Sequence, residues 1–166
     1  MPFADAVRIL NRLKRRRILR DYVLVGGVAA TAYIEPIFTQ DMDVVVLVDS
    51  DEEYLSVFRR LTEFAEGMEG MHHVLGGVPV QVFPTTTKLL YLDVLQNARL
   101  ARVGTLRVKV ASPEHLILMS LEAFRPRDRE RIHLLFSVVD MAEVERLLQR
   151  FDDDKGTLAK RLQSLH

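Results

Sequence analysis

Two short segments decide the fold of this chain: Leu24-Val25-Gly26-Gly27-Val28-Ala29 and Thr39-Gln40-Asp41-Met42-Asp43-Val44. The four apolar residues 22–25 predict a short buried strand, and the two glycines that follow end it. Residues 28–33 are mostly small, which predicts a helix that packs closely on a sheet and ends before Pro36. A second strand, residues 41–48, is apolar enough to be buried on both faces. The predicted order is strand, glycine turn, helix, strand.

The two aspartates of the second segment predict a metal site. Side chains two apart on a strand point to the same face, so Asp41 and Asp43 present two carboxylates side by side. Beside the run Val44–Val48, ionised carboxylates are costly unless a cation compensates them. Mg²⁺, or Mn²⁺, suits this role, since Mg²⁺ takes one or two protein carboxylates and completes its shell with water and phosphate oxygens.

The glycine pair supplies the second half of the predicted site. Without Cβ atoms, the backbone amides of Gly26 and Gly27 can approach phosphate oxygens closely, and a helix begins at that point. Gly-Gly alone indicates a tight turn, and Asp-x-Asp alone indicates a turn or a cap. Together and in this order, they predict a site for a nucleotide phosphate and a divalent metal.

The remaining pattern predicts a sheet followed by helices. Apolar spacing indicates helices at residues 3–17 and 89–98, and a further helix with its apolar face at residues 54–64, capped by Ser50 or Asp51. Strands are expected near Val74 and at residues 78–83, where Pro79 favours a sheet edge or a strand start. Residues 100–103 and 106–110 should form a hairpin around Gly104.

After residue 110 the pattern predicts only helices. Ser112-Pro113-Glu114 combines an N-cap, a proline at the first helical position and an acid in the first turn. Phe124-Arg125-Pro126 should separate this helix from the next, and further helices are expected at residues 140–151 and 155–165. We therefore expect an α/β (α+β) core at residues 1–110 and a helical extension at 111–166, packed as one compact domain.

Composition narrows the classes of protein. With 48% apolar and 28% charged residues, the 166-residue chain is expected to fold as one domain. It has no cysteine, signal peptide or apolar run of membrane-spanning length, so the cytoplasm is the expected location. The formal net charge is zero, and the one dense basic cluster is Lys14-Arg15-Arg16-Arg17 with Arg20. That cluster is typical of a solvated helix end, with a local nucleic-acid contact as the alternative.

At these residues the chain resembles the nucleotidyltransferase fold shared with DNA polymerase beta, in the form found in small bacterial proteins similar to the AbiEii-type toxins. The segments Val110-Ala111-Ser112-Pro113-Glu114-His115-Leu116-Ile117 and Arg125-Pro126-Arg127-Asp128 extend the resemblance into the tail. It implies a small mixed sheet flanked by helices. It also implies metal-dependent transfer of a nucleoside monophosphate from a nucleoside triphosphate to an RNA or protein hydroxyl, with pyrophosphate released. A cognate antitoxin is an implied partner.

The resemblance also implies roles for individual residues. Asp41 and Asp43 would be catalytic and bind the metals, while Gly26, Gly27 and Thr39 would hold the nucleotide. Relatives carry a third carboxylate on a neighbouring strand, and the matching residue here is Gln81, which cannot act as a base. Asp93 could replace it only if its segment were a strand, whereas the pattern there is helical. Three hypotheses follow: an enzyme, a catalytically reduced module that binds a nucleotide or a partner, or a purely structural Asp-x-Asp without a ligand.

Two cations that small relatives carry are absent, because Ile37 and Ser120 stand at their positions. Lys88, Arg125 and Arg127 are the candidates to replace them in a phosphate pocket, with Lys88 expected to bind the nucleotide. Asp128, beside these arginines, is predicted to form a structural ion pair. His72 and His73 should face opposite sides of a strand and are not expected to form a metal site.

Overall fold

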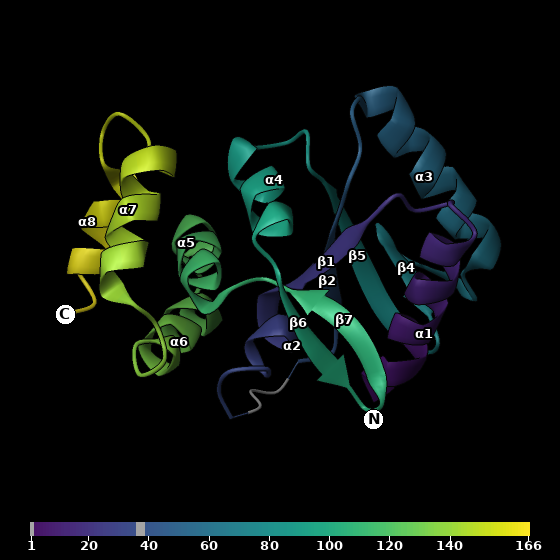
Figure 1. Ribbon diagram of the computed structural model, residues 1–166, viewed down its shortest axis with the longest axis horizontal. Coiled ribbons are helices and arrows are strands. Elements are labelled where there is room, and N and C mark those ends of the chain that lie inside the picture. The colour runs from purple at the N-terminus through teal and green to yellow at the C-terminus, as the bar shows by residue number, and fades with distance from the viewer. Residues whose placement is uncertain (1, 36–38) are drawn as a thin grey trace.

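The computed structural model describes residues 2–35 and 39–166, and it is built around a mixed seven-stranded sheet (Figure 1). The strand order is β3-β4-β5-β2-β1-β7-β6. The strands are β1 (Tyr22–Val25), β2 (Met42–Val46), β3 (Gly67–Glu69), β4 (His72–Leu75), β5 (Val78–Pro84), β6 (Arg99–Val103) and β7 (Leu106–Val110).

The sheet contains both parallel and antiparallel strand pairs. β1 pairs antiparallel with β2 and parallel with β7, and β2 pairs parallel with β5. Hairpins β4–β5 and β6–β7 extend the two sides. All of β1 and most of β2 are buried, as their apolar sequences predict for strands at the centre of a covered sheet.

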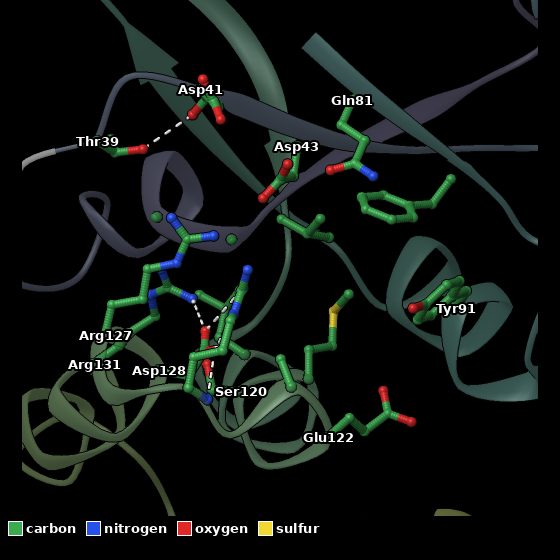
Figure 2. Close-up of a pocket in the computed structure, with 18 of the residues that line it drawn as sticks. Thr39, Asp41, Asp43, Gln81, Tyr91, Ser120, Glu122, Arg127, Asp128 and Arg131 are labelled. Atoms are coloured by element: carbon green, nitrogen blue, oxygen red, sulfur yellow. Dashed lines mark hydrogen bonds and ion pairs between the residues drawn. The ribbon is translucent and has the colours of Figure 1, made fainter. Parts of the chain in front are cut away.

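Helices cover both faces of the sheet. They are α1 (Pro2–Arg15), α2 (Gly26–Ala30), α3 (Asp51–Phe64), α4 (Leu89–Gln96), α5 (Pro113–Ala123), α6 (Pro126–Leu135), α7 (Met141–Phe151) and α8 (Thr157–Gln163). On one face, the Tyr22 hydroxyl donates to the side chain of Asn11 in α1, and His73 packs against Phe58 in α3. Asp43 and Gln81 point from the other face toward α4, α5 and α6 (Figures 1 and 2).

Local signals predicted most of these elements. The Ser50 and Ser112 hydroxyls cap α3 and α5 by accepting from the amides of Glu53 and His115. The hairpin around Gly104 and the break between α5 and α6 are also confirmed. Within the described residues, no helix is long and apolar enough to cross a membrane.

Some boundaries differ from the predictions. The helix after β1 begins at Gly26 and ends at Ala30, while β2 is shorter than expected at both ends. β3 was not predicted, because three exposed residues carry no apolar pattern. Pro79 is not at a sheet edge: β5 lies between β4 and β2. It sits at the strand start, and β2 first pairs with β5 at Val80. The predicted helix end at Pro36 and the position of Ile37 lie outside the described residues.

The passage from sheet to C-terminal helices occurs at Ala111 and is hydrogen-bonded on both sides. Its amide donates to the Leu24 carbonyl (2.9 Å), and its carbonyl accepts from the Tyr33 hydroxyl (2.7 Å). Beside it, His115 of α5 lies 2.6 Å from the Ser112 hydroxyl and 2.8 Å from the Asp93 carboxylate of α4. These contacts bind the start of α5 to the sheet and to α4.

Candidate functional site

A cavity of about 660 Å³ lies between the sheet and α4, α5 and α6. The residues predicted to bind nucleotide or metal all line it: Gly26, Gly27, Thr39, Asp41, Asp43 and Lys88. Figure 2 shows Asp43 and Gln81 on strands of one wall, with Asp41 just before β2, and Arg127 and Arg131 on the helical wall opposite. The folded chain therefore brings residues from distant segments to one cavity.

The floor of the cavity is a row of side chains across the sheet. Asp43 is in register with Val25 on β1 and with Gln81 on β5. The pairing of His73 with Val80 places His72 beside Gln81, so His72 continues the row. Because partners in register share a face, Gln81 lies next to Asp43 on the cavity side of the sheet.

The glycine turn packs directly against this floor. Gly26 has a φ of +67°, and a Cβ there would lie only 2.5 Å from Oδ2 of Asp43. A Cβ on Gly27 would lie 3.3 Å from the Cβ of Thr39 and 3.4 Å from a guanidinium nitrogen of Arg131. At position 26, therefore, only glycine can adopt this φ angle and also lie this close to the Asp43 carboxylate.

The two aspartates occupy different surroundings. Asp43 is partly buried, and burial raises the pKa of its carboxyl, as does Asp41, while Arg131 and His72 act in the opposite direction. The Asp41 side chain is 45% exposed, and its Oδ2 lies 3.8 Å from Nε2 of His72. The Thr39 hydroxyl donates to the backbone carbonyl of Asp41, which holds the approach to β2.

This donor set fits a hard divalent cation that shares its shell with a substrate. Within residues 2–35 and 39–166, no three His, Asp or Glu side chains are grouped closely enough to hold a metal alone. Two carboxylates that line a cavity are, however, the typical protein share of a Mg²⁺ shell. Water and phosphate oxygens would supply the remaining ligands.

The cations of the helical wall are organised by one buried carboxylate. Asp128 is 1% exposed and accepts from Nε of Arg125 (2.7 Å) and from Arg131 (3.2 Å), as the predicted structural ion pair requires. Burial lowers the pKa of the Arg131 guanidinium, and its Nε has no hydrogen-bond partner in the described structure. Arg127 lines the cavity and makes no ion pair with any described residue. Lys88 is bound to Glu122 at 2.6 Å.

Sequence reasoning missed Arg131 and His72 as residues of this site. The spacing of Arg127 and Arg131 places both on one side of a helix and could have indicated the pair. His72 and His73 do face opposite sides, as predicted, but His72 faces the cavity. Asp93 lies in α4 and bonds to His115, so the helical interpretation of its segment is confirmed.

Comparison with known proteins supports the fold. No protein-family model and no curated protein sequence matches the chain. Among solved structures, it is similar to an antigenic nucleotidyltransferase-like protein from Paracoccidioides brasiliensis, with a TM-score of 0.62 and 16% identity over 93% of this chain and 90% of that one. The chain has the nucleotidyltransferase fold.

Two structures of ANT(2'')-Ia are also similar. The complex with adenylyl-2''-tobramycin gives a TM-score of 0.57 and 11% identity over 97% of both chains. The solution structure of this antibiotic-resistance factor gives 0.53 and 14% over 86% of this chain and 90% of that one. At these identities the likeness concerns the fold, and the narrower resemblance to AbiEii-type proteins stays a prediction.

Proposed function

We propose that this protein binds a nucleoside triphosphate with a divalent cation in the cavity and transfers the nucleoside monophosphate to an acceptor hydroxyl. One observation carries the proposal: the contact between the Gly26 turn and the Asp43 carboxylate, which a single added carbon would break. The turn that we propose to bind phosphate and the carboxylate that we propose to bind metal thus lie in close contact. The nucleotidyltransferase fold supports the same reaction class.

In the proposed reaction, the acceptor oxygen attacks the α-phosphorus and forms a new P–O bond. The bond from the α-phosphorus to the oxygen that bridges to the β-phosphate breaks, and pyrophosphate leaves with the electron pair. The hydroxyl proton passes to water. Amides of Gly26 and Gly27 would hold phosphate oxygens, and Arg127 and Arg131 face them across the cavity. Asp41 and Asp43 would hold Mg²⁺ or Mn²⁺, which supplies charge neutralisation and alignment when bound.

The acceptor that we propose is a hydroxyl of RNA or of a protein side chain. The motif Thr39-Gln40-Asp41-Met42-Asp43, in the form similar to AbiEii-type proteins, supports this class and a toxin-like role with a cognate antitoxin. In this proposal, Thr39, which precedes β2, also contacts the nucleotide. Lys88 does the same once its ion pair with Glu122 has opened.

A thermal-shift titration with Mg²⁺ and each nucleoside triphosphate tests binding. A ligand at a hundredfold its dissociation constant should stabilise the protein by about 2.7 kcal/mol. The variant Asp41→Asn with Asp43→Asn should lose this shift, and EDTA should remove it from the native protein. Glu145→Gln with Asp154→Asn changes two exposed carboxylates by the same charge and should keep it. Equal shifts in the two variants would contradict the proposed site.

Gln81 favours a second candidate, a nucleotide-binding module without turnover. The Gln81 side chain lies beside Asp43. A carboxylate at this position could take the proton of the acceptor hydroxyl, whereas an amide cannot. Transfer of label from α-³²P nucleoside triphosphates to tRNA or to lysate protein separates the two candidates. A nucleotide-dependent thermal shift without any labelled product would support the module, and labelled product would support the enzyme.

A further inference from the structure

Positive charge is concentrated on α1 and the β6–β7 hairpin, although the chain as a whole is neutral. Residues 3–20 contain seven basic side chains and one acidic one, and residues 99–110 contain four basic and none acidic. This surface lies outside the cavity and has no role in the proposed nucleotide site. We define the basic face as the set Arg12, Lys14, Arg15, Arg16, Arg17, Arg102, Arg107 and Lys109.

Specific contacts join the two elements of the basic face. Nδ2 of Asn11 in α1 donates to the Arg107 carbonyl of β7 at 3.1 Å. Lys14 and Lys109 pair with the two oxygens of one carboxylate, Asp21, at 2.9 and 2.6 Å. Figure 1 shows the hairpin beside α1, with the hairpin turn near the end marked N and the basic end of α1 farther along the helix. The Asn11 and Asp21 contacts therefore connect the basic end of α1 to strand β7.

Most of this charge is not compensated within the protein. Arg12, Arg15 and Arg16 are exposed and make no ion pair with any residue in 2–35 or 39–166. Arg12 and Arg15 lie three residues apart on α1, where like charges repel, and Arg16 directly follows the helix. On the hairpin, Arg102 stands directly opposite Arg107, both exposed, which is also unfavourable. The chain has 23 acidic residues, yet within the described part of the chain Asp21 alone forms ion pairs with the basic face.

The end of α1 shows a further local cost. Arg17 adopts a left-handed conformation with φ of +61°, where glycine or asparagine usually ends a helix. For any other residue this conformation costs on the order of 1 kcal/mol. Arg17 adds a positive charge to the basic face at this conformational cost. A ligand that binds this charge would explain why an arginine stands here.

We propose that the basic face binds RNA through its phosphate backbone. A membrane surface is not favoured, because Ala6, Val7, Leu10 and Leu13 on the apolar side of α1 are all 0% exposed and cannot insert. The choice of RNA rests on the proposed function, which needs an acceptor hydroxyl, since RNA carries one on every ribose. Strand β7 leads from the basic face to α5, which lines the cavity, so one sheet holds both sites.

Fluorescence anisotropy with labelled tRNA, without nucleotide, tests this proposal at about 50 to 200 mM salt. Phosphate contacts release counterions, and each contact contributes about 0.7 to 0.9 to the slope of log affinity against log salt. Arg12→Gln with Arg15→Gln should therefore reduce the slope by about 1.5 and weaken binding. The control is Arg59→Gln with Arg60→Gln, which removes the same charge from exposed positions on α3 and should leave both unchanged.

Several outcomes would overturn the proposal. These are equal slopes in the two variants, displacement of tRNA by poly-glutamate at equal charge, binding to anionic vesicles in preference to tRNA, or tighter binding to a DNA duplex. An unchanged thermal midpoint would show that Arg12→Gln with Arg15→Gln remains folded. Asp41→Asn with Asp43→Asn should still bind tRNA. A failure of the nucleotide site would thus be seen separately from a failure of the basic face.

Discussion

Replacing Gly26 by alanine should weaken both the stability of the protein and its nucleotide site. An alanine at φ of +67° costs about 1–2 kcal/mol for backbone conformation alone. Its Cβ would also lie 2.5 Å from Oδ2 of Asp43, so the carboxylate must rotate, at about 1 kcal/mol for an unfavourable rotamer. The total, about 2–3 kcal/mol, corresponds to a fall in Tm of roughly 4–12 °C for a chain of this size.

Gly70→Ala is the matched control for this prediction. Gly70 has a φ of +60°, and nothing lies within 4 Å of the position that its Cβ would take. This variant should therefore suffer the backbone cost without the contact, with a fall in Tm of roughly 2–8 °C. Scanning calorimetry with and without Mg²⁺ and a nucleoside triphosphate measures both effects. Gly70→Ala should keep the ligand-induced shift, and Gly26→Ala should lose it.

The result that would refute this reasoning is a Gly26→Ala protein that melts like Gly70→Ala and keeps the native ligand-induced shift. The Asp43 carboxylate would then have moved without any effect on stability or nucleotide binding. The contact between Gly26 and Asp43 would therefore not be needed for the nucleotide site. A loss of shift in both variants would show instead that overall stability, and not the geometry around Asp43, controls nucleotide binding.

Three further predictions concern the walls of the cavity. Gln81→Glu places a carboxylate beside Asp43 and should raise labelled-nucleotide transfer by roughly 10²–10⁴-fold if it acts as a general base, while Gln81→Met should not. Asp43→Asn should raise the Tm of the metal-free protein at pH 7, because burial raises the pKa of this carboxyl and destabilises its ionised form. That gain should shrink as the pH falls through the raised pKa, where the native side chain also becomes neutral, and melts across a pH series would check the sign. Arg127→Gln should leave the Tm unchanged and weaken nucleotide binding roughly tenfold or more, as measured by calorimetric titration. Arg131→Met should weaken binding and also lower the free energy of unfolding by about 1–3 kcal/mol, because it removes a partner of buried Asp128.

Much of the fold could be predicted because its signals are local. Ser112 caps α5 through an amide three residues away, and the conformation of Gly26 is a property of one residue. The spacing of Asp41 and Asp43 likewise predicts a shared face from strand geometry alone. Such features require no knowledge of what the chain packs against.

The missing parts of the site depend on tertiary placement. His72 reaches the cavity only because β4 pairs with β5 in one particular register, and a shift by one residue would send His73 there instead. Arg131 faces Gly27 only because α6 folds back across the sheet after the break at Arg125. Neither the strand register nor the helix crossing can be deduced from the residues themselves.

The hydrogen bonds at Ala111 have a consequence for how the protein loses its structure. The chain passes there from sheet to helices, but its amide and its carbonyl are both held, by Leu24 and Tyr33. Because both backbone groups of Ala111 are hydrogen-bonded, local unfolding of the sheet should also disturb the start of the C-terminal helices, and the reverse. We therefore expect the sheet and the C-terminal helices to melt in one cooperative transition, with calorimetric and van't Hoff enthalpies in agreement.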